Sequence, residues 1–463
     1  MRKPNIIFLF TDDQRFDTIG GLNNPAIKTP NLDRLVAEGT TFTNAYIMGG
    51  SSGAVCMPSR GMLHTGRSLY HIQGRGESVD PNHAMLGETL QQSGYTSFGT
   101  GKWHNGPSAF ARSFDAGAKI FFGGMDDHWN VPACDYDPTG KYRPSPKIDN
   151  PHLDNTVTWH RCDHIAAGTH STDLFVDATI NFIEQQPTED PFLAYVSFMA
   201  PHDPRSMPEE FLQLYDPGQI DLPINFMPQH PFDNGWMTGR DEKLAGFPRT
   251  ESEVRRHIAE YYAIISHLDA AIGHLQDALN ARGILEETII VFAGDNGLAV
   301  GQHGLMGKQN LYDHSVHIPL IFSGPGIPKG EQRDALVYLI DIFPTLCDLT
   351  QTPIPETIEG HSLQPVLDDS EDKVRDYLHF AFLEAQRGIR DSQYKLIEYA
   401  VGGSHTQTQL FDLIHDPKET RNLVDDLAYV EIYQRLQNQL KQWQTIYGDT
   451  REHGQAFWSA YTA

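Results

Sequence analysis

Residues 5–14 read Asn-Ile-Ile-Phe-Leu-Phe-Thr-Asp-Asp-Gln, and this stretch decides the fold of the chain. It begins with a short run rich in apolar residues that favour β-structure, which predicts a strand buried on both faces of a sheet. Asp12 and Asp13 follow directly where that strand ends. Ligands of open α/β sheets bind just beyond the carboxyl ends of the strands, so this order predicts a functional site after the first strand.

The same order, a short apolar strand followed by polar side chains, recurs three more times along the chain. We predict these strands over residues 96–99, 192–198 and 288–293. Helices separate the strands, and the clearest, over residues 252–282, repeats its apolar residues in steps of three and four. Because the carboxyl ends of parallel strands meet at one edge of a sheet, the polar side chains that follow them should converge. They are Asp12, Asp13, Lys102, His104, His202, Asp295 and Asn296.

The length of 463 residues and a change of character near residue 368 predict two domains. Residues 1–368 are expected to form an α/β catalytic domain whose large, mostly parallel central sheet is flanked by helices. Within it, residues 106–168 show little periodicity and predict a functional insertion outside the core. Residues 369–463 are expected to form a smaller α+β subdomain with an antiparallel sheet. Its strands are predicted over residues 377–382, 394–399 and 409–413, with a closing helix over 429–445.

The charge and the hydropathy of the chain exclude several classes of partner. A formal net charge of −25 argues against nucleic acid and against an anionic membrane surface. No apolar run is long enough to span a membrane. The first residues lack the pattern of a signal peptide. We expect a periplasmic or secreted protein whose signal is absent from this chain, and a cytoplasmic location is the alternative.

The chain has four cysteines, and no pair has the C-x-x-C spacing of a zinc site. Cys134 and Cys162 flank one loop-rich stretch and either form a disulfide or remain two free thiols. Cys56 is followed by Pro58 and Arg60. A thiolate near an arginine is either a nucleophile or a redox thiol.

The longer string at residues 56–67, C-M-P-S-R-G-M-L-H-T-G-R, resembles the signature of the type I, formylglycine-dependent sulfatases, C-x-P-S-R-x-x-L-x-T-G-R, at every fixed position. The resemblance covers nearly the whole chain and implies the fold of the alkaline phosphatase superfamily. It implies a sulfuric ester hydrolase similar to the bacterial carbohydrate sulfatases. The other matching motifs are P-N-I-I-F-L-F-T-D-D-Q at 4–14, G-K-W-H at 101–104, P-H at 201–202, G-D-N-G at 294–297, H-G-L-M-G-K at 303–308 and L-F-D-L-I-H-D-P-K-E-T-R-N-L at 410–423.

The resemblance also implies two cofactors and one protein partner. Cys56 would be oxidised to formylglycine by a dedicated formylglycine-generating or sulfatase-maturating enzyme. Residue 56 would then bind a metal together with Asp12, Asp13, Asp295 and Asn296. These side chains offer only oxygen ligands, which suit a hard cation. Calcium is the usual ion of the family, and the chemistry of the ligands also allows magnesium.

The remaining matched positions correspond to residues that carry out the reaction. Lys102 and Lys308 match lysines that stabilise the negative charge of the sulfate group. Arg60 would support the oxygens of the formylglycine. His202 matches the general acid that protonates the leaving alcohol, and His104 matches the base that regenerates the aldehyde.

We expect the sulfate ester to belong to an oligo- or polysaccharide rather than to an aryl alcohol. Sugars are held by hydrogen bonds to their hydroxyls and by stacking on flat rings, and the long polar insertion, together with His170 and Arg205, supplies both kinds of group. Arg161 or Arg205 could read a second anionic group, whereas the alternative for any one of these residues is a loop packed by its own aromatic rings. The candidate substrate-binding residues are His128, Trp129, His160, Arg161, His170, Arg205 and His303.

Four other functions are compatible with parts of this pattern. The chain could be an arylsulfatase, or a phosphonate or phosphate ester hydrolase of the same superfamily. The phosphoester enzymes tend to place a histidine where this chain has Asn296. A catalytically inactive protein that binds sulfated glycans is a more distant alternative. A thiol redox protein is disfavoured because no second cysteine lies near Cys56.

Overall fold

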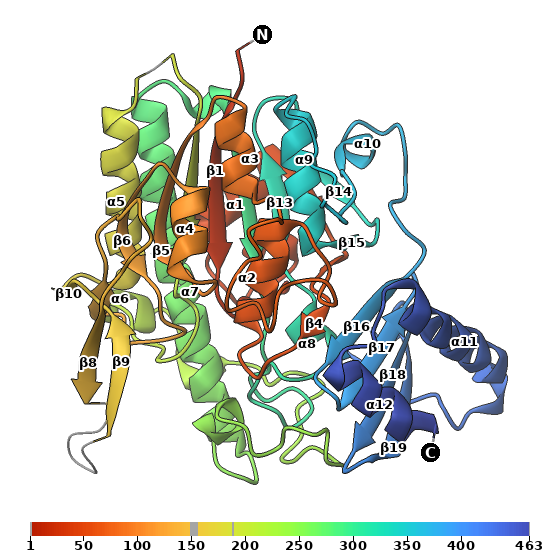
Figure 1. Cartoon of the computed structure of the whole chain (residues 1–463). Coiled ribbons are helices and arrows are strands. Elements are labelled where there is room, and N and C mark those ends of the chain that lie inside the picture. Colours follow the sequence, from red (N-terminus) through yellow and green to blue (C-terminus); the bar gives the residue numbers. More distant parts are fainter. Residues whose placement is uncertain (1, 149–155, 188, 463) are drawn as a thin grey trace.

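The computed structural model describes residues 2–148, 156–187 and 189–462 (Figure 1). Its largest sheet has eight strands in the order β14-β2-β13-β12-β1-β11-β5-β6. The four strands expected from the sequence are neighbours in this sheet and run parallel to one another. The prediction of a mostly parallel α/β sheet is therefore confirmed. The four strands are β1 (Asn5–Thr11), β5 (Thr96–Lys102), β11 (Phe192–Ser197) and β12 (Thr288–Gly294).

Antiparallel pairing occurs only toward one edge of this sheet, among the described strands. Strand β13 (Leu320–Ser323) runs antiparallel to β12 and to β2 (Gly39–Phe42). Strand β14 (Glu331–Arg333) closes that edge, parallel to β2. At the other edge, β6 (Ala116–Phe121) runs parallel to β5. The sheet is therefore mixed, with a parallel centre.

Helices cover both faces of the sheet because alternate side chains of a buried strand point to opposite faces. In β1, Ile7 and Leu9 pack into one core cluster, whereas Phe8 and Phe10 pack into the other. The first cluster includes side chains of α1 (Pro30–Glu38), α5 (Ser171–Gln185) and α7 (Glu251–Ala281). The second includes side chains of α2 (Cys56–Thr65), α3 (Leu86–Gln92), α4 (Pro107–Ser113) and α9 (Ile342–Leu349).

The C-terminal part forms a second sheet beside the first, with two helices packed on it (Figure 1). Its strands β16, β17, β18 and β19 are antiparallel, and β4 (Gly49–Gly50) joins β16 in parallel. The antiparallel subdomain sheet is thus present, while the division at residue 368 stays a prediction. The bounds are β16 (Leu378–Phe382), β17 (Gln386–Arg390), β18 (Tyr394–Val401), β19 (Ser404–Asp412), α11 (Val430–Ile446) and α12 (Glu452–Thr462).

The segment expected to be an insertion outside the core is partly core. Its first part forms α4 and β6, and Phe110 and Ile120 are buried in the main core cluster. Glycines and alanines between these residues hide their periodicity, which explains the wrong expectation for residues 107–121. The described remainder forms two hairpin-like pairs, of β7 (Asn130–Ala133) with β10 (His164–Ala167) and of β8 (Pro144–Ile148) with β9 (Val157–Arg161).

Cys134 and Cys162 are both free thiols in the part of the chain that the structure describes. None of the described helices is both long enough and apolar enough to cross a membrane. The remaining short α-helices and strands are α6 (Glu209–Leu212), α8 (Asp313–Val316), α10 (Gln364–Leu367), β3 (Ala45–Tyr46) and β15 (Val337–Tyr338).

Candidate active site

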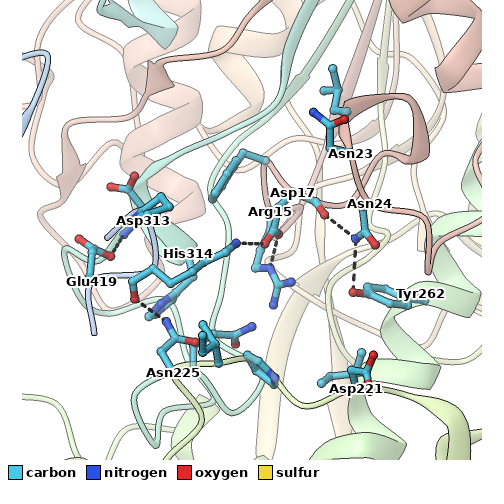
Figure 2. A pocket seen from close by; sticks show the side chains of 18 residues that line it. Arg15, Asp17, Asn23, Asn24, Asp221, Asn225, Tyr262, Asp313, His314 and Glu419 are labelled. Carbon is cyan, nitrogen blue, oxygen red and sulfur yellow. Dashed lines mark hydrogen bonds and ion pairs between the residues drawn. The ribbon is translucent and has the colours of Figure 1, made fainter. Parts of the chain in front are cut away.

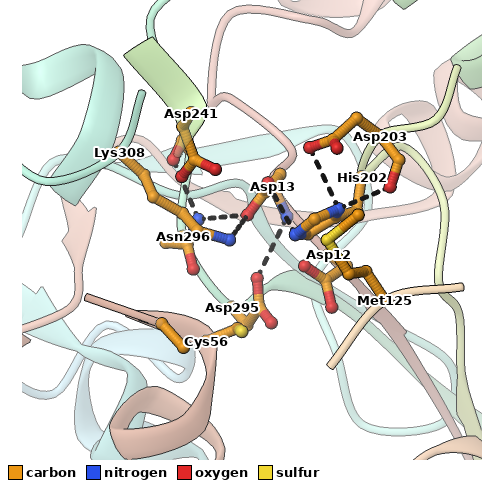
Figure 3. A network of polar contacts seen from close by, with 12 residues as sticks. Asp12, Asp13, Cys56, Met125, His202, Asp203, Asp241, Asp295, Asn296 and Lys308 are labelled. Carbon is orange, nitrogen blue, oxygen red and sulfur yellow. Dashed lines mark hydrogen bonds and ion pairs between the residues drawn. The ribbon is translucent and has the colours of Figure 1, made fainter. Parts of the chain in front are cut away.

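The ends of the four parallel strands bring the predicted polar residues to one place (Figure 3). Backbone hydrogen bonds hold the strand ends together: Asp12 donates to Ala200, and Asp295 donates to Thr11. The set is almost entirely buried, with Asp12 and Asp295 fully shielded from solvent. The residues brought together are Asp12, Asp13, Cys56, Arg60, Lys102, His104, His202, Asp295, Asn296 and Lys308.

The acidic side chains of this set fit a hard cation. Ligand atoms of Asp12, Cys56 and Asp295 all lie within 4.8 Å of one another. The amide of Asn296 donates to Asp13 Oδ1 at 2.7 Å. Asp12 Oδ1 and Asn296 Oδ1 are buried and have no hydrogen-bond partner among the described residues. Because unpaired buried oxygens are rare and unfavourable, these two atoms support a bound cation with oxygen ligands.

Electrostatics at this point also favour a cation. Burial, and then the neighbouring Asp12 carboxylate, raise the pKa of Asp295 above its ordinary value. Burial opposes ionisation of Asp12 as well, but Lys102 and Arg60 hold its pKa well below the ordinary range. Two carboxylates this close repel each other when both are ionised. A divalent cation between them would remove that repulsion.

Three buried basic side chains surround the carboxylates. Arg60 donates to Asp12 Oδ2 at 2.9 Å and to Asp295 Oδ2 at 3.0 Å. Lys102 contacts Asp12 Oδ2, and Lys308 Nζ lies 2.5 Å from Asp13 Oδ1. This acidic protein therefore contains a local basic cluster, as an anionic substrate would require.

Cys56 is the first residue of α2, where the free N–H groups of the helix favour negative charge. Its Sγ lies 3.4 Å from His104 Nδ1 and 3.6 Å from Lys102 Nζ. Arg60 follows one helical turn later and so lies on the same face of the helix as Cys56. The spacing of the C-x-P-S-R string thus places the side chain of Cys56 beside the positively charged side chain of Arg60.

The two histidines of the site have different surroundings. Burial, and then the nearby Lys102, lower the pKa of His104 well below its ordinary value, so its ring is neutral. His202 Nε2 lies 3.6 Å from Asp13 Oδ2, and its Nδ1 donates to the carbonyl oxygen of Asp203 at 2.8 Å. A neutral His104 can accept a proton, whereas His202 faces the carboxylate side of the site.

A cavity of about 280 Å³ lies above Cys56 and forms the entrance to the site. Cys56, His104, His202 and Lys308 are among the residues that line it. The other lining residues, which form the wall of the cavity, were not predicted from the sequence. They lie in short polar and glycine-rich loops that have no periodicity. The wall residues are Gly53, Ala54, Gly124, Met125, Trp236, Arg240, Asp241 and Gln309.

None of the seven predicted substrate-binding residues is among those that line this cavity. His128 and His170 are buried behind it: His128 Nε2 donates to the carbonyl of His202 at 3.1 Å, and its ring stacks on that of His170. Trp129 packs edge-on against His170. Other residues therefore form the lining of this cavity.

The other four predicted residues also lie outside the lining of this cavity. His303 is buried and stacks on Tyr312, with 3.9 Å between the ring centroids. Arg205 contacts His257 and lies over the ring of Tyr261. His160 and Arg161 belong to β9, at the end of the two-stranded sheet with β8. A direct contact of these residues with substrate stays a prediction.

A second cavity, of about 250 Å³, lies next to the loop that follows Asp13 (Figure 2). Arg15 and Lys418 line it, and both pair there with the carboxylate of Asp17. The hydroxyl of Tyr261 accepts from the Arg15 N–H and donates to the Asp13 carbonyl. No residue that lines this cavity lines the one above Cys56.

Comparison with known proteins agrees with this site. Residues 4–352 match the family described as Sulfatase, and residues 301–446 match the family described as N-sulphoglucosamine sulphohydrolase, C-terminal. An N-acetylglucosamine-6-O-sulfatase of Bacteroides thetaiotaomicron is 25% identical over 97% of this chain and 87% of its own length. An ulvan-active sulfatase of Formosa agariphila is 30% identical over 95% of this chain and 80% of its own length.

Solved structures show the same fold. A protein determined in complex with its substrate D-glucosamine-2-N,6-O-disulfate has a TM-score of 0.77 and 24% identity, covering 98% of this chain and 99% of its own. A phosphonate monoester hydrolase of Agrobacterium radiobacter has a TM-score of 0.74 and 21% identity, covering 96% of both chains. At these identities the likeness concerns the fold alone, which hydrolases of different esters share.

Proposed function

The chain belongs to the sulfatase family and is a sulfuric ester hydrolase, and on this premise we propose that it removes sulfate from a carbohydrate by means of a formylglycine at position 56. One observation carries the proposal: Cys56 begins α2 with Lys102, His104 and the buried carboxylates around it. Relatives named for N-acetylglucosamine-6-O-sulfate and for ulvan support a sugar as the alcohol part. The mixed polar and aromatic wall, with Trp236, Asp241 and Gln309, suits such a ligand.

We propose that Asp12, Asp13, Asp295 and Asn296 hold one divalent cation, calcium in the first instance and magnesium as the alternative. When bound, such a cation polarises a sulfate oxygen and lowers the pKa of a hydroxyl nucleophile. The unpaired oxygens of Asp12 and Asn296 support this assignment. Lys102 and Lys308 would add fixed positive charge for the sulfate oxygens.

Formylglycine requires a maturation enzyme that oxidises the Cys56 thiol, and the structure supports early modification. Cys56 is only 2% exposed in the folded chain. Modification before folding is complete would give the maturation enzyme direct access to this thiol. The hydrated aldehyde would supply one hydroxyl as nucleophile and a second through which the sulfate group is released.

The chain's own side chains would move the protons. His202 lines the cavity and would donate a proton from Nε2 to the oxygen of the leaving alcohol. His104, neutral and 3.4 Å from the Cys56 sulfur, would accept the proton of the residue-56 hydroxyl that expels sulfate. Arg60 would hold the carboxylates in place from the helix side.

The location of the protein belongs to the same proposal. We infer a periplasmic or extracellular site of action, because polymeric sulfated sugars do not cross membranes unaided. The relatives named N-acetylglucosamine-6-O-sulfatase and ulvan-active sulfatase support a sulfated sugar as the substrate on which this inference rests.

The decisive experiment measures free sulfate. Protein co-expressed with a maturation enzyme is incubated with defined sulfated oligosaccharides, 4-nitrophenyl sulfate and a phosphate monoester, with Cys56→Ala as the matched control. We expect release from one oligosaccharide to be much faster than from the aryl ester, and none from the Cys56→Ala variant. Faster turnover of the phosphate ester would move the chain to the phosphoester hydrolases, a reading that Asn296 disfavours. Binding of oligosaccharide without turnover, with formylglycine confirmed by mass spectrometry, would mean an inactive binding protein.

A further inference from the structure

The loop after β11 carries a carboxylate directly behind the proposed general acid. His202 Nδ1 lies 2.8 Å from the carbonyl oxygen of Asp203 and 3.3 Å from its Oδ1. Both atoms are acceptors, so Nδ1 carries a hydrogen and points away from the cavity. The other nitrogen, Nε2, is left on the side of Asp13. The backbone carbonyl of Asp203 and, at longer distance, its carboxylate thus favour the ring orientation that leaves Nε2 free for a substrate.

Asp203 is itself held from the cavity wall. Arg240 donates to both of its carboxylate oxygens, from Nη1 to Oδ2 at 2.8 Å and from Nη2 to Oδ1 at 3.0 Å. Such a two-point ion pair fixes the plane of the carboxylate as well as its position. Burial opposes ionisation of Asp203, but His202 and Arg240 lower its pKa to about 2. The carboxylate is therefore charged under all ordinary conditions.

Arg240 connects Asp203 to further polar residues that line the cavity. Arg240 also contacts Asp241 Oδ1, and Asp241 Oδ2 accepts from Gln309 Nε2 at 2.6 Å. Gln309 Nε2 donates in turn to the carbonyl oxygen of Gly53 at 2.8 Å. Gly53 lies three residues before Cys56. A chain of polar contacts therefore connects the residue expected to protonate the leaving group with the segment that carries the nucleophile.

We propose that Asp203 is a positioning residue that holds the ring of His202 with Nε2 toward the leaving-group oxygen, and that Arg240 holds Asp203 in place. The inference rests on the proposed function, in which His202 is the general acid. It goes further because it assigns a role to two residues outside the matched motifs. Neither residue needs to touch the reacting atoms for this role.

The proposal predicts a loss that depends on the leaving group. An alkoxide of a sugar needs a proton as it leaves, whereas 4-nitrophenolate leaves readily without one. General acids contribute about 10²–10⁴-fold to a rate, so misplacing one should remove part of that factor. For Asp203→Asn we expect kcat for the sulfated sugar to fall about 10- to 100-fold with little change in KM. The fall for 4-nitrophenyl sulfate should be clearly smaller.

Further variants separate positioning from general damage. Arg240→Gln should act in the same direction as Asp203→Asn, and the double variant should lose little more than either, because the two residues act as one unit. Arg240→Lys should recover part of the loss, since lysine keeps one charged contact. Arg421→Gln, in an exposed ion pair with Asp426, is the control and should change neither rate. Thermal unfolding and formylglycine content are compared for all variants.

The outcomes distinguish this proposal from the one on which it rests. Equal losses on both substrates in folded Asp203→Asn and Arg240→Gln, or no loss in either, would overturn the positioning role. If Asp203→Asn does not fold, the same comparison on Arg240→Gln and Arg240→Lys decides the question. Absence of sulfate release by the unaltered, modified enzyme would instead refute the proposed function.

Discussion

Lys308 shows how one side chain can be both buried and permanently charged. Burial opposes its charge, but the Asp13 carboxylate 2.5 Å away raises the pKa of Lys308 well above its ordinary value. The same side chain lines the cavity above Cys56. Lys308 is therefore a fixed positive charge in the lining of the cavity where we propose that the sulfate group binds.

The substitution Lys308→Met keeps the length and the apolar stem of this side chain and removes only its charge. We expect kcat/KM for sulfate release to fall about 10²–10³-fold, because a fixed charge aimed at the transition state is lost. The control is Lys373→Met at an exposed ion pair with Asp376, which should be neutral. A loss below about 3-fold, with calcium still raising the melting temperature, would remove Lys308 from the proposed mechanism.

At the scale of elements, α3 and α4 approach each other closely beside strand β5. A Cβ added to Gly87 of α3 would lie 2.0 Å from the carbonyl oxygen of Ser113, at the end of α4. Atoms cannot approach to this distance, so the two helices would have to separate. Gly87 is thus retained for packing, although alanine is the better helix former.

Gly87→Ala should therefore lower the free energy of unfolding by about 1–3 kcal/mol through overpacking. The matched control is Gly246→Ala, where an added Cβ meets nothing within 4 Å. Urea unfolding of both variants measures the difference. An unchanged midpoint for Gly87→Ala would show that the helices move apart without loss.

Elements with a clear apolar period could be predicted from the sequence, and others could not. Helix α7 and strands β1, β11 and β12 were expected within a few residues of their bounds. Strand β17 has the sequence Q-R-G-I-R, yet all five of its residues are buried. Its Arg387 is buried because it pairs with Asp449, a residue distant in the chain. A strand whose burial depends on such a partner has no local signal.

At the scale of the whole molecule, Asp17 joins the loop after β1 to the C-terminal subdomain (Figure 2). It accepts from Arg15 Nε at 2.8 Å and from Lys418 Nζ at 2.9 Å. Burial opposes its ionisation, but Arg15 and Lys418 hold the pKa of Asp17 below the ordinary value of 3.8. The contact therefore links the loop after β1 with a segment some 400 residues away in the chain.

Asp17→Asn should destabilise the protein by about 1–3 kcal/mol at pH 7, because two charged hydrogen bonds are weakened. The folded pKa is depressed, so this stabilisation is present above the unfolded pKa and is lost as the pH falls toward the folded pKa. The difference between the unaltered protein and the variant should thus shrink below about pH 4. Unfolding curves at pH 7 and pH 3.5 test this, and a pH-independent difference would contradict the assignment.

The parallel sheet, the polar residues at the carboxyl ends of its strands and the family could all be predicted from the amino-acid sequence. These features are local: each strand is followed directly by its polar residues, and Cys56 and Arg60 share one helical face because they lie one turn apart. The wall of the cavity and the ion pair of Asp203 with Arg240 could be identified only from the tertiary structure. Those contacts join loops without periodicity across tens to hundreds of residues, and the packing of the whole chain is what brings such loops together.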